Sequence, residues 1–418
     1  MPGLKRIVTV LPRGEFNHNM LPGFASELGA AFAARGLTLH AIDSAKPNFL
    51  ADLVSCARDP ETAIYVGHYF YDLALSYADI TTKEQVNFFE AFEQPVFARI
   101  ADHPYAIFML DRIEQAARTT HFLVPTVEFA EEARFVNPAL RHFHQVTPSV
   151  TMAPPAEKEV LPLERRPIDI FMPCAFKEVS PTVEEIRQDC LKKGHGMVHV
   201  IDEVLAANEQ QSDLSILAQF LAAARRQFRG GFQPASPLTT GDRKILHVLS
   251  CIDFEIRTRR RRRAVESLGL LDPALRIVVT IPEDLRETLP ALRDRPNVEL
   301  IGKVDSAKAR ELYLNSRCVV NVNPTYTSLV SERVRNAMMF GCCVISDRSA
   351  HAAEVFAAGE EILFMEGCEV DSLGDLLRGS PAELQPLATA ARRRVLADFS
   401  IDRLAADTLQ VMGEVLGD

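Results

Sequence analysis

Short apolar runs alternate with amphipathic segments along most of the chain. β-Branched residues dominate the short runs, whereas apolar residues at positions such as Phe24, Leu28 and Phe32 recur at helical spacing before Gly36. The pattern predicts strands at 5–12, 37–44 and 63–70, and helices at 21–36 and 48–57. Strands separated by helices of this length favour a parallel sheet with ligands at the carboxyl ends of its strands.

The second half of the chain repeats this alternation after a Pro-rich, charged segment at 150–167, which we expect to be a linker. Further strands are predicted at 168–176, 244–251, 274–281, 297–302, 317–324 and 342–347. The fold class is therefore α/β, with two Rossmann-like domains and a cleft between them. The expected division is 1–160, 165–395 with a helical excursion at 198–236, and 396–418 as a C-terminal helix that crosses back to the first domain.

Composition narrows the class of protein. The 418 residues carry a formal net charge of −10, with 47% apolar and 24% charged residues, as in an ordinary globular protein. This balance excludes disordered, collagen-like and coiled-coil chains. The acidic total also argues against a general nucleic-acid binder.

The eight cysteines show no Cys-x-x-Cys spacing, so we expect reduced, buried thiols in a cytosolic protein. The N-terminus lacks the apolar region of a signal peptide, and no apolar run is long enough to cross a membrane. We expect a cytoplasmic protein, and peripheral contact with a membrane stays compatible with that expectation.

The most informative segment is 321–364. A strand ends in a polar loop, Thr325 to Ser328, and Ser328 or Ser331 is suited to be the N-cap of the next helix, with Glu332 in its first turn. A helix N-terminus beside Arg333 would suit a diphosphate. The alternative is an ordinary crossover helix whose polar side faces water.

This segment resembles the donor-binding signature of GT-B glycosyltransferases of family 4. The matching positions are Asn336-Ala337-Met338, Gly341, Asp347, Glu354, Gly359 and Leu363-Phe364. It is more similar to the spore-maturation-protein-like branch of these enzymes. That likeness is carried by Glu332-Arg333-Val334, by Asn321 or Asn323, by Asp253, Arg257 and Arg261, and by Asp102-His103-Pro104.

The resemblance implies a GT-B fold, a nucleotide-sugar donor on the second domain and an acceptor on the first. It also implies that the exit of the 297–302 strand holds the nucleotide base. The donor-binding residues that we expect are Arg257, Arg261, Gly302, Lys303, Asn323, Ser328, Ser331, Glu332, Arg333 and Asn336. We expect no metal and no further cofactor, because helix dipoles and basic side chains offset the departing diphosphate's charge in such enzymes.

The chain departs from family 4 at one motif. The Glu-x7-Glu pair of that family aligns with Ser328 and Asn336 here. An Asn still hydrogen-bonds a ribose hydroxyl but supplies no charge, so the catalytic role of the first Glu is not carried over.

The Arg-rich run at 257–268 allows several interpretations. Arg257 and Arg261 share one helix face, so they are candidates for diphosphate contact, whereas a solvated face, a nucleic acid or an anionic lipid are alternatives. Asp253 and Glu255 are interpreted as the N-cap and first-turn acid of this helix rather than as metal ligands.

His103 is the candidate for acid–base work, with Asp102 beside it to fix its tautomer. The alternative is a structural histidine. His18 and His68 are weaker candidates.

The leading hypothesis is a glycosyltransferase of glycan biosynthesis that moves a sugar from a nucleotide sugar to a glycan, lipid or protein acceptor. A GT-B nucleotide-sugar epimerase or hydrolase and a catalytically silent sugar-nucleotide-binding module are the alternatives.

Overall fold

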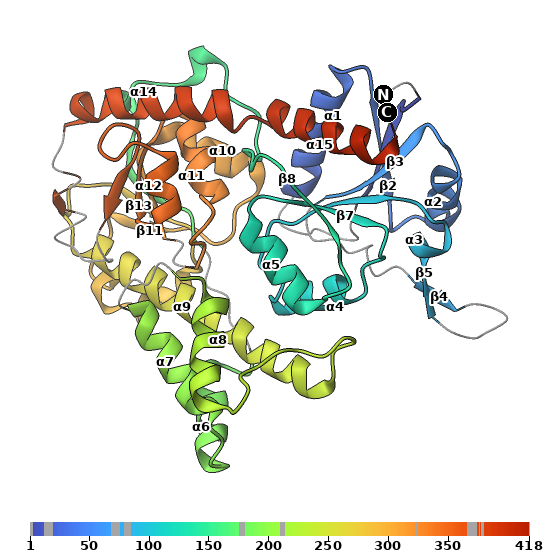
Figure 1. The fold of residues 1–418 in the computed structure, drawn as a ribbon. Helices are drawn as coiled ribbons and strands as arrows, with labels where there is room; N and C mark the ends of the chain where they lie inside the picture. Colours follow the sequence, from blue (N-terminus) through green and yellow to red (C-terminus); the bar gives the residue numbers. More distant parts are fainter. Residues whose placement is uncertain are drawn as a thin grey trace. The chain divides into compact units, whose positions relative to one another are not determined.

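The computed structural model describes residues 3–11, 20–67, 76–78, 85–174, 180–209, 214–322, 325–365, 374–375, 377 and 380–417. The chain divides into two compact units. Unit 1 comprises 1–149, 233–250 and 401–418, and unit 2 comprises 150–232 and 251–400. Each unit is built on its own parallel sheet with helices packed on it (Figure 1).

The sheet of unit 1 has the strand order β2-β1-β3-β6-β7-β8, with every neighbouring pair parallel. Its strands are β1 (Arg6–Leu11), β2 (Thr38–Asp43), β3 (Thr62–Val66), β6 (Val96–Arg99), β7 (Thr120–Val124) and β8 (His142–Gln145). Its helices are α1 (Met20–Ala33), α2 (Phe49–Ala57), α3 (Phe88–Ala91), α4 (Ile107–Glu114), α5 (Val127–Val136) and α15 (Ile401–Leu416). The hairpin β4 (Ser76–Ala78) and β5 (Gln85–Asn87) precedes α3.

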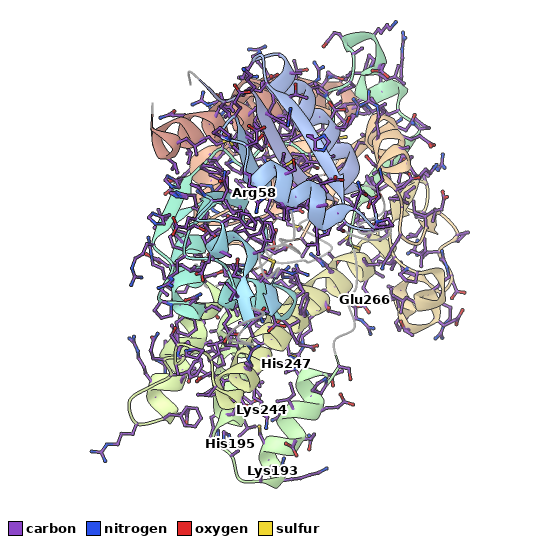
Figure 2. The ribbon with its side chains drawn as sticks, turned by 90° about the vertical axis from the view of Figure 1, so that its right-hand side faces the viewer. Arg58, Lys193, His195, Lys244, His247 and Glu266 are labelled. Atoms are coloured by element: carbon purple, nitrogen blue, oxygen red, sulfur yellow. The ribbon has the colours of Figure 1, made fainter. Side chains whose placement is uncertain are left out.

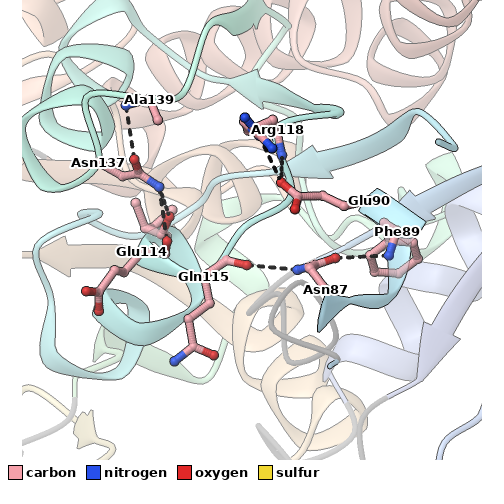
Figure 3. Close-up of polar contacts among 9 residues, drawn as sticks. Asn87, Phe89, Glu90, Glu114, Gln115, Arg118, Asn137 and Ala139 are labelled. Atoms are coloured by element: carbon pink, nitrogen blue, oxygen red, sulfur yellow. Dashed lines mark hydrogen bonds and ion pairs between the residues drawn. The ribbon is translucent and has the colours of Figure 1, made fainter. Parts of the chain in front are cut away.

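Two asparagine side chains hold the C-terminal end of α4, where a helix leaves carbonyl groups without intrahelical partners (Figure 3). The Asn137 amide donates to the carbonyl oxygens of Ile113 and Glu114, both at 3.1 Å. The Asn87 amide donates to the Gln115 carbonyl at 2.8 Å. The end of α4 is thereby fixed to α3 and α5.

The sheet of unit 2 has the order β11-β10-β9-β12-β13-β14, again parallel throughout. Its strands are β9 (Ile168–Met172), β10 (Ile277–Val279), β11 (Val298–Leu300), β12 (Ser316–Asn321), β13 (Cys343–Asp347) and β14 (Leu363–Met365). The helices are α6 (Val183–Lys192), α7 (Met197–Glu209), α8 (Ile216–Gln227), α10 (Ser306–Asn315), α11 (Glu332–Met339), α12 (Ala350–Val355) and α14 (Pro381–Asp398). The chain order of these strands is that of a dinucleotide-binding fold, whose direction reverses between β9 and β12.

Arg166 fastens the helices of unit 2 to this sheet. Its side chain is buried, and its guanidinium donates to the carbonyl oxygens of Leu161, Ser316 and Phe340 at 2.8–2.9 Å. Because one guanidinium satisfies three separate loops, it joins the ends of α10 and α11 to the start of β9.

Helix α9 (Thr240–Gly269) corrects one sequence prediction. The segment 244–251 is not a strand but part of this helix, along which Lys244, His247 and Glu266 are spaced in Figure 2. At the start of the helix the Thr239 hydroxyl accepts from the Asp242 N–H at 3.1 Å, and the Asp242 carboxylate accepts from the Thr239 N–H at 2.9 Å. Short apolar runs do not distinguish a strand from a buried helix, and this reciprocal cap decides the outcome here.

Residues 233–250 belong to unit 1, although the sequence-based division assigns them to the second domain. Arg243 forms ion pairs with Asp111 and Glu114 of α4, and the Leu238 N–H donates to Glu114 at 3.0 Å. Charge pairing with α4 therefore holds this segment in unit 1.

The C-terminal helix α15 packs against α1 within unit 1 (Figure 1). Arg35 pairs with Asp402 at 3.1 Å, and Asp407 accepts hydrogen bonds from the Thr147 backbone and hydroxyl. No helix in the described part of the chain is both long and apolar enough to cross a membrane.

Candidate functional site

The carboxyl ends of β9, β12 and β13 form the edge of unit 2 at which the strand order reverses. Asn321, at the end of β12, donates to the Ser346 hydroxyl of β13 at 2.9 Å and accepts from the Ser331 hydroxyl at 3.1 Å. Ser331 is the N-cap of α11 and accepts from the Val334 N–H at 3.5 Å. This chain of hydrogen bonds fixes the N-terminus of α11 to the two strands. Of the two predicted N-caps, Ser328 and Ser331, the helix uses Ser331, with Glu332 in its first turn.

Helix α9 brings a paired arginine to the same unit. Asp253, which is 1% exposed, accepts from Arg257 Nε at 3.2 Å and from Nη2 at 2.5 Å. The Arg257 guanidinium also lies 4.9 Å from the centre of the Tyr326 ring. The two contacts hold the guanidinium in place beside the loop that follows β12.

Asp253 has a different role from the one that the sequence suggests. It lies in the middle of α9, so it is not an N-cap, because the helix begins thirteen residues earlier at Thr240. Its carboxylate positions Arg257 instead, since the two residues are four apart and lie one helical turn from each other on the same face.

Arg261, one turn further along α9, is buried at the end of β12. Its Nε donates to the Val322 carbonyl at 3.5 Å, and 7% of the residue is exposed. Burial, and then the positive charges of Arg333 and Arg257, lower the pKa of Arg261 to about 9. Two further guanidinium groups therefore act on that of Arg261 at the point where the strand order reverses.

The end of β9 completes this edge. Burial raises the pKa of the Cys174 thiol to about 11, while Arg261 and Arg333 act in the opposite direction. The Thr280 hydroxyl accepts from the Cys174 N–H and donates to its carbonyl, both at 2.8 Å. The thiol is thus a neutral, fixed neighbour of the arginines rather than a nucleophile.

Thr325 adds a polar group that none of the described residues satisfies. It is fully buried, and among the described residues its hydroxyl has no hydrogen-bond partner. It precedes Tyr326, the ring that Arg257 covers. A buried hydroxyl without a partner is costly, so its presence beside the arginines is a sign of a ligand site.

We name Arg257, Arg261 and Arg333 the arginine cluster. Sequence reasoning identified all three, and it missed Tyr326 and Cys174. An aromatic residue in a polar loop and a cysteine just after a strand were the available signals. Ser328 lies half-buried in the same loop after β12.

Other predicted donor residues lie elsewhere. Gly302 and Lys303 are exposed after β11, at the outer edge of the sheet and separated from β9 by β10. Asn323, like His18 and His68 of unit 1, lies outside the described residues.

Asn336 has a structural role that differs from the predicted ribose contact. It is buried, its Oδ1 accepts from the Thr151 N–H at 3.0 Å, and its Nδ2 donates to the Thr151 hydroxyl at 2.9 Å. Both ends of the amide are thereby engaged by the start of the predicted linker. The helix turns its Asn inward because α11 is buried along most of its surface.

His103 is also more buried than its predicted role requires. Only 1% of it is exposed, and its ring is stacked between Tyr105 and Phe129. Its Nδ1 lies 2.8 Å from Oε2 of Glu132, which belongs to α5. This arrangement is that of a structural histidine, and Glu132 was missed because it lies 29 residues away in the sequence.

Among the described residues, no group of three or more His, Cys, Asp or Glu side chains is placed to share a metal ion.

Residues 258–410 match the family described as "Glycosyl transferase-like", a segment that includes Arg261, Arg333 and the whole of α11. No curated protein matches the chain.

Solved structures resemble the whole chain at low sequence identity. A glycosyltransferase from Rickettsia africae has 11% identity and a TM-score of 0.52, over 99% of each chain. Sucrose-phosphate synthase from Thermosynechococcus elongatus has 12% identity and a TM-score of 0.52, over 98% of this chain and 99% of that one. HepE of Anabaena, in complex with UDP-glucose, has 10% identity and a TM-score of 0.50, with the same coverage. The chain thus has the GT-B fold, and residues 258–410, most of which lie in unit 2, resemble the glycosyl transferase-like family.

Proposed function

We propose that this protein is a glycosyltransferase that binds the diphosphate of a nucleotide sugar at the arginine cluster and the N-terminus of α11. The observation that carries the proposal is that Arg261, buried at the carboxyl edge of the sheet, lies in the field of two further positive charges, Arg257 and Arg333. Cations held together in a buried place favour an anionic ligand, and guanidinium groups match the geometry of phosphate oxygens.

Each part of this edge has a definite task in the proposal. Helix α11 directs its first N–H groups and its positive dipole end at the same place. The Asp253 carboxylate holds Arg257, so that the guanidinium is already oriented when the ligand arrives. Thr325 supplies a hydroxyl that a phosphate or sugar oxygen would satisfy.

The same charges suit the chemistry of transfer. When the bond from the sugar to the nucleotide breaks, negative charge accumulates on the departing diphosphate. Preoriented guanidinium groups and a helix N-terminus stabilise that charge without any reorganisation during the step. We therefore propose that turnover needs no metal ion, which a chelator titration during the assay would test.

The finer assignment follows the sequence resemblance to the spore-maturation-protein-like branch. Its motif residues Asp253, Arg257 and Arg261 on α9 and Glu332-Arg333-Val334 on α11 come from distant parts of the chain. Their electrostatic interaction in one unit supports the assignment.

A second candidate is a binding module without transfer activity. It is favoured by Asn336, which stands at a family Glu position and is bound to Thr151. Release of free sugar or a glycosylated product from a nucleotide sugar would exclude it.

The test compares UDP binding by calorimetry in the wild type, Arg333→Ala and Arg259→Ala. Arg259 is the matched control, because it lies on α9 but is paired with Glu255 on an exposed face. Losing one charged hydrogen bond costs about 1.5–3 kcal/mol, so Arg333→Ala should weaken binding by about tenfold to a hundredfold. Arg259→Ala should bind like the wild type. Equal affinity in all three proteins would refute the site, and no binding of UDP, GDP or ADP to the wild type would refute the function.

A further inference from the structure

Unit 1 contains a buried arginine that the donor site does not use. Arg99 ends β6, is 6% exposed, and places its guanidinium 4.9 Å from the centre of the Phe24 ring in the second turn of α1. A buried guanidinium at the carboxyl end of β6 therefore packs against α1.

Tyr65 brings an unsatisfied hydroxyl to the same face of this sheet. It is 2% exposed, and its hydroxyl has no hydrogen-bond partner among the described residues. Burial raises the pKa of Tyr65, and the charge of Arg99 acts against that rise, so the two side chains interact. The register confirms the common face, because Tyr65 lies opposite Phe97 and Arg99 follows Phe97 by two residues.

The position in the sheet is also that of a ligand site. In the order β2-β1-β3-β6-β7-β8, the direction of the connections reverses between β1 and β3. Ligands of open parallel sheets bind at such a point, beyond the carboxyl ends of the strands. The Tyr65 ring leans toward this edge, since a Cβ on Gly67, just past the end of β3, would lie 3.6 Å from its Cε1 atom.

We propose that Arg99 and Tyr65 bind an anionic group, a phosphate or a carboxylate, on the acceptor molecule. The naming of this ligand as the acceptor rests on the proposed glycosyltransferase function, whereas the anion site itself does not. Arg99 need not be unpaired for this role, because one guanidinium offers five N–H donors in a planar fork. The Tyr65 hydroxyl would donate one further hydrogen bond to the anion. The anion would in turn give this buried hydroxyl a partner.

The experiment measures binding of glucose 6-phosphate, glucuronate and glucose to the full chain in the presence of saturating UDP. UDP occupies the arginine cluster, so a further anion reports on unit 1. We expect the phosphate or the carboxylate sugar to bind at least tenfold more tightly than neutral glucose. If glucose binds equally well, or if neither anionic sugar binds, the proposal is wrong.

Two conservative variants locate the binding. Tyr65→Phe should lower the affinity for the anionic sugar by about threefold to tenfold, which corresponds to the loss of one hydrogen bond. Arg99→Lys should lower this affinity further, because lysine lacks the planar fork of N–H donors. Thr120→Val is the matched control, because the buried hydroxyl of Thr120 also has no hydrogen-bond partner in the described part of the chain and lies at the opposite end of the strands. Equal binding by the wild type and Tyr65→Phe would overturn the site, and so would equal weakening by Thr120→Val.

The design separates the two proposals. UDP titration reports the donor site alone, and Tyr65→Phe should leave it unchanged. If UDP fails to bind but the anionic sugar binds in a Tyr65-dependent way, the donor proposal falls and the anion site stands. The opposite result, UDP binding with no response to Tyr65→Phe, removes the anion site alone.

Discussion

Single residues at the carboxyl edge of the second sheet divide into those that present charge and those that hold the fold. The charge of Arg333 acts on Arg261, whereas Asn336 has both amide atoms bonded to Thr151. Their side-chain partners, not their residue types, distinguish the proposed binding residues from a structural one.

The Asn336–Thr151 pair gives a test at this scale. Asn336→Leu should reduce the free energy of unfolding by about 1–3 kcal/mol, because the buried N–H and hydroxyl of Thr151 lose their partners. The affinity for UDP should stay at the wild-type value, as calorimetry on the folded variant would measure. A variant that is fully stable but binds UDP weakly would return Asn336 to the donor site.

At the scale of elements, the turn between α11 and β13 depends on one glycine. Gly341 has a φ of +72°, and a Cβ there would lie 2.9 Å from Val160 Cγ1 and 3.1 Å from Arg166 Nη2. Its N–H donates to the Met338 carbonyl at 2.9 Å, which closes the helix. The conformation and the space both require glycine here.

Gly341→Ala should therefore destabilise the protein by about 2–4 kcal/mol, adding backbone strain to overpacking against Arg166. Chemical denaturation would measure the loss. Gly359→Ala is the matched control, since Gly359 also has a positive φ but no atom within 4 Å of the added Cβ. The control should show only the smaller cost of backbone strain, and equal losses would exclude the packing contribution.

Other elements differ from their sequence predictions for reasons of context. The segment 244–251 has the composition of a strand, yet the cap at Thr239 and the ion pairs of Arg243 place it in a helix. The segments correctly predicted as strands are bounded by glycines, prolines or amphipathic helices. There the local hydrophobic pattern agrees with the tertiary environment.

At the scale of the whole molecule, the histidines of unit 1 tie stability to pH. His121 of β7 and His144 of β8 approach within 3.1 Å, Nδ1 to Nε2, and His142 stacks on His121. Burial, then the charges of His142 and His144, lowers the pKa of His121 to about 4. Burial also lowers the pKa of His144, although Glu414 of α15 acts against that shift.

These shifts predict acid sensitivity of the folded chain. In the unfolded chain a histidine is protonated near pH 6.5, whereas in the folded protein the pKa of His121 is about 4. The unfolded state therefore binds more protons between these values, so the free energy of unfolding should fall as the pH drops through this window. Above pH 7 these histidines should not change the stability with pH, because they are neutral in both the folded and the unfolded state.

Calorimetric unfolding between pH 7.5 and 4.5 would measure this loss in the wild type and in His121→Phe, which keeps a ring but cannot titrate. We expect the variant to lose less stability on acidification than the wild type. Parallel pH profiles for the two proteins would show that other groups cause any acid unfolding.

The sequence alone determined the α/β class and two successive sheet-forming regions, and it narrowed the N-cap of α11 to Ser328 or Ser331. These features depend on local periodicity, capping and turn chemistry, which neighbouring residues specify. The closer branch of glycosyltransferases, the acceptor and the cleft between the domains stay predictions.

Only the tertiary structure decided that Asp253 positions Arg257, that Glu132 holds His103, and that Asn336 binds Thr151. It also brought Tyr65 and Arg99, from two neighbouring strands, onto one face of the first sheet. Each of these depends on which buried polar groups become neighbours after folding. The physical reason is that a buried charge or hydroxyl must find its partner in space, and the residue that provides it can lie anywhere along the chain.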